Sequence, residues 1–213
     1  MQRTSFRESA HRRLRIYPSA EADEVKSALL AAAHPPGERR RLLYRIGQLL
    51  LEEIKKSGGW ETATYPPVVV LRGGLLMCRP IERVLGHTPT GLIAPLRNSP
   101  MSDPTVRYAS IPPLTNCQFA LVDMLMASGR TMVACAEAIR RQLGTDTPGA
   151  RFVAPFVASD AWRLLLSRFP KATIDCLWHR ESVGSDGRMV GPGFDLGDLA
   201  IGCGQSCTSW GGH

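Results

Sequence analysis

The sequence predicts an α/β fold in which helices flank a central, mostly parallel sheet. Short apolar runs rich in β-branched residues, such as residues 66–71, alternate with longer segments whose apolar residues recur at helical spacing. The 213 residues carry moderate charge and no low-complexity tract, which suits one domain with a buried core. We therefore expect a single domain over residues 1–213.

The first half of the chain is expected to begin with a basic, irregular segment over residues 1–20. Helices should follow at 20–33 and 38–56, the second with its apolar side chains on one face. The valine run at 66–71 predicts a central strand covered on both faces, because its apolar residues are continuous rather than alternating. Residues 75–85 have the pattern of a further helix.

The second half is expected to add a projecting arm and more parallel strands. Residues 86–118 are rich in proline, asparagine and serine and contain short extended pieces, which is typical of a β-arm that can cover a site. Strands at 119–123, 151–157 and 172–178, with a helix at 160–168, then follow the βαβ pattern of a parallel sheet.

Residues 119–131 combine a strand, an acid, a small-residue turn and a helix start. The strand ends on Asp123, Ala127-Ser128-Gly129 form the turn, and Thr131 opens a helix that runs to about Leu143. A helix start offers unpaired N–H groups and partial positive charge to a phosphate, while Asp123 can accept hydrogen bonds from sugar hydroxyls. The pattern indicates a sugar-phosphate site, although an ordinary strand–turn–helix junction has the same pattern.

A glycine turn follows the strand at 66–71. Gly73 and Gly74 allow the backbone to approach a ligand closely, and Arg72 supplies a cationic fork. The alternative is a turn with a surface arginine. Arg97 lies in the predicted arm, where a cation can close over a phosphate.

The net charge of +7 favours a small anionic ligand such as a polyphosphate. The arginine clusters at 12–15 and 39–41 lack the interleaved aromatics of a nucleic-acid platform, so nucleic acid is not the expected partner. No apolar run reaches membrane-spanning length and the N-terminus lacks a signal-peptide core, which predicts a cytoplasmic protein without a membrane partner. Cys203, Cys207 and His213 fall short of a zinc set, so no residue is assigned to a metal.

Four motifs, in order over residues 38–202, resemble those of the uracil phosphoribosyltransferases, which have the type I phosphoribosyltransferase fold. Leu71-Arg72-Gly73-Gly74-Leu75 is similar to the family's pyrophosphate loop, and Arg97 to the arginine that begins its flexible arm. Residues 122–131 resemble the family's phosphate loop, and 192–198 its hood, the loop over the base. The resemblance divides the domain into an N-terminal arm and helix at 1–37, a flexible arm at 86–118, a hood at 184–202 and a tail at 203–213.

The resemblance implies transfer of a 5-phosphoribosyl group from phosphoribosyl pyrophosphate, the donor, to a base nitrogen. It also implies that magnesium binds mainly through this donor and that the protein is a homodimer. Arg72 and Arg97 would hold the pyrophosphate and Asp123 the ribose hydroxyls. Asp195 would orient the base and its leaving proton, and Asp198 would support either metal-bound water or the base loop. The implied catalytic residues are Arg72, Asp123 and Asp195. The implied substrate-binding residues are Arg72, Gly73, Gly74, Arg97, Asp123, Met126, Ala127, Ser128, Gly129, Arg130, Thr131, Val190, Gly193, Phe194, Asp195 and Asp198.

The chain departs from the family pattern mainly in the hood. Phe194 stands where the family has a glycine, and Leu199 where an arginine normally follows the last aspartate. In the phosphate loop, Met124 replaces proline and Arg130 replaces a glycine. The expected acceptor is therefore uracil or a related heterocyclic base. The alternative is a non-catalytic regulatory or RNA-binding protein that retains the fold.

Overall fold

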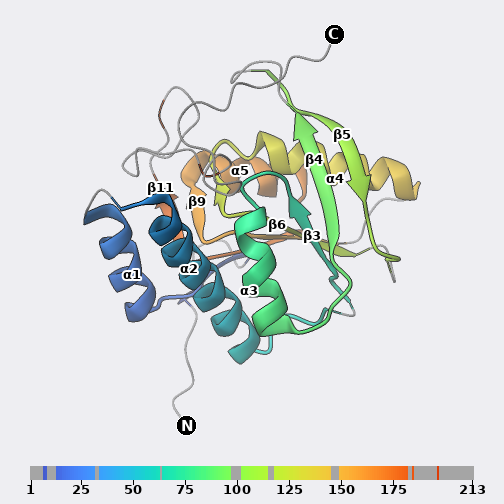
Figure 1. The fold of residues 1–213 in the computed structure, drawn as a ribbon. Helices are drawn as coiled ribbons and strands as arrows, with labels where there is room; N and C mark the ends of the chain where they lie inside the picture. Colours follow the sequence, from blue (N-terminus) through green and yellow to red (C-terminus); the bar gives the residue numbers. More distant parts are fainter. Residues whose placement is uncertain are drawn as a thin grey trace.

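The centre of the fold is an eight-stranded sheet (Figure 1). The computed structural model describes residues 7–8, 13–31, 34–62, 64–96, 102–114, 118–144, 149–181, 184 and 196. From β2 to β4 neighbouring strands are parallel, and only the edge strands β1 and β5 run antiparallel to their neighbours, which confirms the predicted fold class. In sheet order the strands are β1 (Arg7–Glu8), β2 (Leu14–Ile16), β10 (Thr173–Cys176), β8 (Ala150–Val153), β6 (Phe119–Val122), β3 (Pro67–Val70), β4 (Gly91–Leu96) and β5 (Thr105–Ser110).

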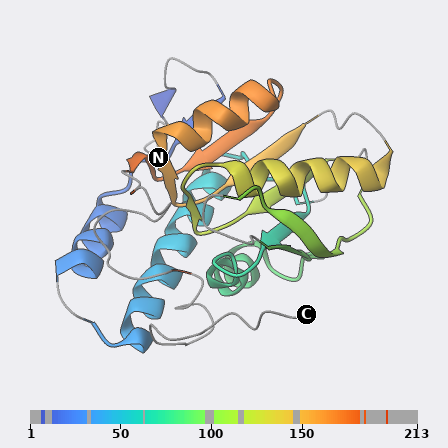
Figure 2. The same ribbon diagram turned by 90° about the horizontal axis from the view of Figure 1, so that it is seen from above.

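Helices cover both faces of this sheet (Figure 2). One face carries α1 (Ala20–Ala31), α2 (Pro36–Lys56) and α3 (Leu75–Leu85), and the other α4 (Arg130–Leu143) and α5 (Ser159–Arg168). Alternate side chains of a strand point to opposite faces, so Val69 belongs to the first core layer while Val68 and Val70 belong to the second. This two-sided burial is why β3 is a continuous apolar run.

A second, three-stranded parallel sheet was not predicted. It consists of β11 (Trp178–Glu181), β9 (Phe156–Ala158) and β7 (Leu125–Met126) in that order. The segments 151–157 and 172–178, each predicted as one strand, are in fact divided between the two sheets. Pro155 lies at the first break, because a proline has no N–H to continue a sheet ladder, and its carbonyl accepts from Leu177 at 3.2 Å and Trp178 at 3.0 Å.

The prediction of an irregular segment over residues 1–20 was wrong for β1 and β2. Leu14 is fully buried, and β2 pairs in parallel with β10. Without β2, the backbone N–H and C=O groups along that edge of β10 would lack a strand partner. Helix α2 begins two residues earlier than expected, since Pro36 at the first helical position already has a helical φ. Among the described helices, none combines the length and apolar character needed to cross a bilayer.

Candidate functional site

The ends of β3 and β6 form the centre of the candidate site. These neighbouring parallel strands are in register, with Val68 opposite Leu121 and Val69 opposite Val122, so the segments after them meet at one edge of the sheet. From β3 the chain continues to β4 on one side and later reaches β6 on the other. Ligands of open α/β sheets bind at such a change of strand order.

The loop after β3 rests directly on this edge. A β-carbon on Gly74 would lie 2.3 Å from the carbonyl oxygen of Val70 and 2.9 Å from that of Val122. A β-carbon on Gly73 would lie 3.0 Å from Oδ1 of Asp123. At Gly74 only glycine allows this approach, whereas at Gly73 an added β-carbon would require the Asp123 carboxylate to shift. The sequence predicted that these glycines approach a ligand, and the structure shows that they approach the sheet. The peptide bond between Leu71 and Arg72 is cis, and the Arg72 side chain is exposed beside the loop.

Asp123 is the carboxylate at this edge. Its backbone N–H continues the sheet ladder to the carbonyl of Val153 at 3.0 Å, and its Oδ1 accepts from the N–H of Met124 at 2.7 Å. Burial raises the pKa of Asp123 to about 7, although hydrogen bonds from the N–H groups of Met124 and Leu125 oppose the rise. A carboxylate that is oriented by backbone N–H donors and shielded from solvent is well suited to accept hydrogen bonds from ligand hydroxyls.

The predicted phosphate loop runs from Met126 to the start of α4. Gly129 has a left-handed backbone with φ of 78°, and a β-carbon there would lie 3.0 Å from both Cα and the carbonyl oxygen of Ala161 in α5. Helix α4 begins at Arg130, one residue before the predicted start, and no side chain caps it. Its first turn therefore presents backbone N–H groups of the kind that bind phosphate.

Arg130 connects this loop to the arm. Its Nη2 lies 3.1 Å from Oδ1 of Asp103, which lies between β4 and β5. The antiparallel pairing of these strands confirms the predicted β-arm. Asp103 did not emerge from the sequence, because nothing in an isolated exposed aspartate indicates a partner far along the chain.

The structure brings the loop with Arg72, Gly73 and Gly74 against the end of β6, where Asp123 lies. The loop from Met126 to Thr131, including Ala127 and Ser128, follows Asp123 along the chain and leads from β7 into α4. The remaining predicted site residues lie outside the described part of the chain: Arg97, Val190, Gly193, Phe194, Asp195 and Asp198. Leu196 is described, and its Cβ would lie 3.9 Å from a β-carbon on Gly73, so this residue of the predicted hood reaches the same corner. Within the described ranges, no group of three or more His, Cys, Asp and Glu side chains could hold a metal ion.

Solved structures support the fold. The AQ2163 protein from Aquifex aeolicus superposes with a TM-score of 0.75 at 16% identity, over 88% of this chain and 97% of that one. An orotate phosphoribosyltransferase from Aeropyrum pernix matches with a TM-score of 0.42 at 20% identity, over 63% of this chain and 70% of that one. A purine phosphoribosyltransferase from Pyrococcus horikoshii matches with a TM-score of 0.40 at 18% identity, over 66% and 91%.

Sequence comparison identifies the family. Among curated proteins, none is significantly similar to this chain. A family model described as uracil phosphoribosyltransferase matches residues 59–200, which is more than half of the chain and includes the loop after β3, Asp123 and the phosphate loop. The chain therefore belongs to the uracil phosphoribosyltransferase family.

Proposed function

We propose that this protein transfers a 5-phosphoribosyl group from phosphoribosyl pyrophosphate to a ring nitrogen of uracil or a related heterocyclic base. The bond between the anomeric carbon and the pyrophosphate oxygen breaks, a carbon–nitrogen bond forms, and the base nitrogen loses its proton. The approach of Gly73 to Asp123 at the change of strand order is the observation that carries this proposal within the family.

The described residues can hold the donor at both ends. Arg72 would bind the leaving pyrophosphate, where negative charge develops, and the two glycines that follow it carry no side chain to obstruct the ligand. The loop from Ala127 to Thr131 would bind the 5-phosphate at the start of α4. Asp123, placed between these loops, would accept hydrogen bonds from the ribose hydroxyls.

Magnesium is proposed to bind mainly through the donor. Mg²⁺ usually keeps several waters and is held largely by substrate phosphates, which phosphoribosyl pyrophosphate would supply. When bound, the ion would neutralise charge on the leaving pyrophosphate. Arg72 would act on the same oxygens, and Arg97 is proposed to join it.

The acceptor is proposed to be read by the hood. Asp195 would take the proton lost from the base nitrogen and Asp198 would support that loop, while Phe194 and Leu199 would reshape the pocket relative to other family members. Uracil is the first acceptor to test, followed by modified pyrimidines and other heterocycles. From the family resemblance we also propose that the protein is a homodimer and that it is located in the cytoplasm. Light scattering on the purified protein would test whether it is a dimer.

Pyrophosphate release from phosphoribosyl pyrophosphate with magnesium and a panel of bases would test the proposal. We expect release that depends on one base and falls at least about a hundredfold in Asp123→Asn. Absence of release with every base, together with no calorimetric binding of the donor, would overturn it. RNA binding with a steep salt dependence in that case would favour the regulatory alternative.

A further inference from the structure

Helix α1 lies outside the residues matched by the family model, yet it makes polar contacts with the small sheet beside the site. Nε1–H of Trp178 in β11 donates to Oδ1 of Asp23 at 2.8 Å. Nζ of Lys26 lies 2.5 Å from Oε1 of Glu181 at the end of β11. We call Asp23 and Lys26 the α1 clamp, because together they hold both ends of this strand.

The clamp is reinforced by aromatic rings. The Lys26 ammonium lies 4.5 Å from the ring centroid of Trp178 and 5.6 Å from that of Phe156 in β9, and the two rings stack at 4.8 Å. The Lys26 and Glu181 side chains are only 21% and 14% exposed, so water screens this pair less than a pair on the open surface. Lys26 therefore fixes β9 as well as β11.

Strand β9 in turn positions Asp123. Its Phe156 N–H donates to the carbonyl of Met124 at 3.3 Å, and Leu125 pairs with Phe156 in the small sheet. Met124 and Leu125 are the residues whose N–H groups hold the Asp123 carboxylate. The orientation of that carboxylate therefore depends on the strand that Lys26 and Trp178 hold in place.

The same strand also leads to the phosphate loop. Helix α5 begins at Ser159, directly after β9, and its Ala161 is the residue against which Gly129 packs. A displacement of β9 would therefore move both the support of Asp123 and the wall behind the phosphate loop.

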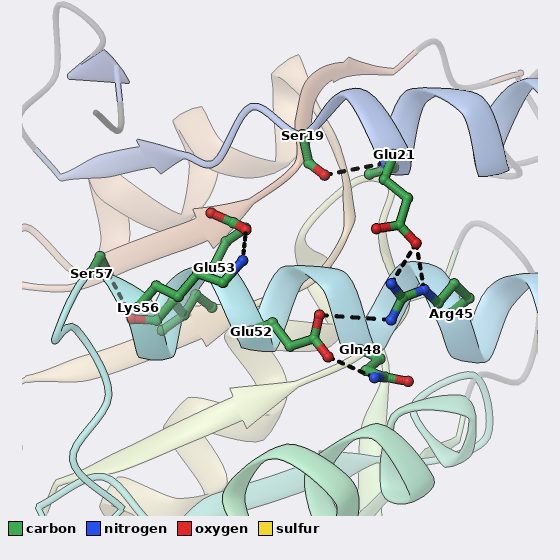
Figure 3. Close-up of polar contacts among 10 residues, drawn as sticks. Ser19, Glu21, Arg45, Gln48, Glu52, Glu53, Lys56 and Ser57 are labelled. Atoms are coloured by element: carbon green, nitrogen blue, oxygen red, sulfur yellow. Dashed lines mark hydrogen bonds and ion pairs between the residues drawn. The ribbon is translucent and has the colours of Figure 1, made fainter. Parts of the chain in front are cut away.

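Helix α1 is itself capped at its start and paired with α2 (Figure 3). Ser19 Oγ accepts from the N–H of Ala22 at 3.2 Å at the start of the helix. Arg45 of α2 donates from Nε to Oε1 of Glu21 at 2.8 Å and also faces Glu52 (Figure 3). The clamp thus acts from a helix anchored to the body of the fold.

We propose that Asp23 and Lys26 are positioning residues for binding of the phosphoribosyl donor, acting through Trp178, Phe156 and the backbone around Asp123. This inference rests on the proposed function, because the ligand of Asp123 is the proposed donor. Residues held by a second layer of contacts keep their geometry within narrow limits, and small displacements far from a reaction centre can cost much of its activity.

Calorimetric titration of phosphoribosyl pyrophosphate with magnesium into the full chain tests the inference. Lys26→Met is expected to raise the Kd for the donor by about fivefold or more, and Lys26→Arg to restore most of the affinity. The matched control is Lys56→Met, which also removes a lysine and an ion pair, in this case with Glu53 of its own helix (Figure 3). Its Kd should stay within about twofold of that of the wild type.

A second variant covers the case in which Lys26→Met does not fold. Trp178→Phe keeps an aromatic ring on Phe156 and loses the hydrogen bond to Asp23, and it should weaken donor binding in the same direction. If the folded clamp variants bind phosphoribosyl pyrophosphate as tightly as the wild type does, the positioning role of the clamp is contradicted, while the proposed function stands. A wild type that binds no donor would overturn the proposed function and the clamp with it.

Discussion

A β-carbon on Gly73 would lie 3.0 Å from Oδ1 of Asp123, so the loop after β3 rests against the carboxylate that follows β6. These residues are fifty positions apart in the sequence and meet because β3 and β6 pair in parallel. An added β-carbon at Gly73 would require the Asp123 carboxylate to shift, so the loop proposed to bind pyrophosphate and the carboxylate proposed to bind ribose are in direct contact.

Substitution of Gly73 by alanine should therefore weaken donor binding more than folding. The added methyl group would displace the Asp123 carboxylate by a few tenths of an ångström, and we expect the Kd for phosphoribosyl pyrophosphate to rise by about tenfold. Gly37→Ala is the control, because a β-carbon at Gly37 meets nothing within 4 Å. Equal donor affinity in the two variants would contradict the proposed position of the ligand.

Gly74→Ala should instead act on stability. Its β-carbon would meet the carbonyl oxygens of Val70 and Val122, which belong to the central sheet and cannot move aside as a flexible side chain can. We expect a loss of about 3 kcal/mol or more in the free energy of unfolding, measured by urea denaturation. A loss below about 1 kcal/mol would mean that the loop is not packed on the sheet in this way.

The raised pKa of Asp123 predicts a pH-dependent cost to folding. In the unfolded chain this carboxyl titrates near its ordinary value of 3.8, whereas burial raises its pKa in the folded protein to about 7. Below pH 4 the Asp123 carboxyl is protonated in both the folded and the unfolded protein, so its burial does not lower the free energy of unfolding. Between pH 4 and 7 the free energy of unfolding falls, because the carboxyl ionises more readily in the unfolded chain, and above pH 7 this loss is complete. Asp123→Asn should therefore become more stable than the wild type over that range, by on the order of 2 kcal/mol at pH 8.

Urea denaturation of both proteins from pH 4 to 8 measures this difference. The aspartate and asparagine proteins should converge at the acidic end, where the wild-type carboxyl is protonated. A constant difference across the range would show that burial does not raise the pKa of Asp123.

The ion pair between Arg130 and Asp103 predicts competition with the 5-phosphate. Asp103 is 83% exposed in its side chain, so Asp103→Asn should change stability by less than about 0.5 kcal/mol. It should lower the Kd for the donor by about twofold to threefold at low salt, because the Asp103 carboxylate no longer competes with the phosphate for Arg130, and salt should reduce this gain. A weaker donor affinity in Asp103→Asn would show that the pair helps to form the site.

The sequence predicted local features better than distant contacts. The bounds of α3 are as expected, and the glycines at 73, 74 and 129 occupy the positions of close approach that their residue type suggested. The division of 151–157 between two sheets was missed, because both parts are apolar and buried and nothing in the composition marks the change of sheet. The contact of Lys26 with Glu181 joins opposite ends of the chain, which residue patterns along the sequence do not reveal.

Calorimetric titration of phosphoribosyl pyrophosphate with magnesium into the wild type and Asp123→Asn tests the central claim most directly. The control is Glu82→Gln, which neutralises an exposed carboxylate on α3. We predict binding by the wild type and Glu82→Gln with equal affinity, and a Kd at least about tenfold higher in Asp123→Asn. No binding by the wild type, or equal affinity in all three proteins, would contradict a phosphoribosyl site at the ends of β3 and β6.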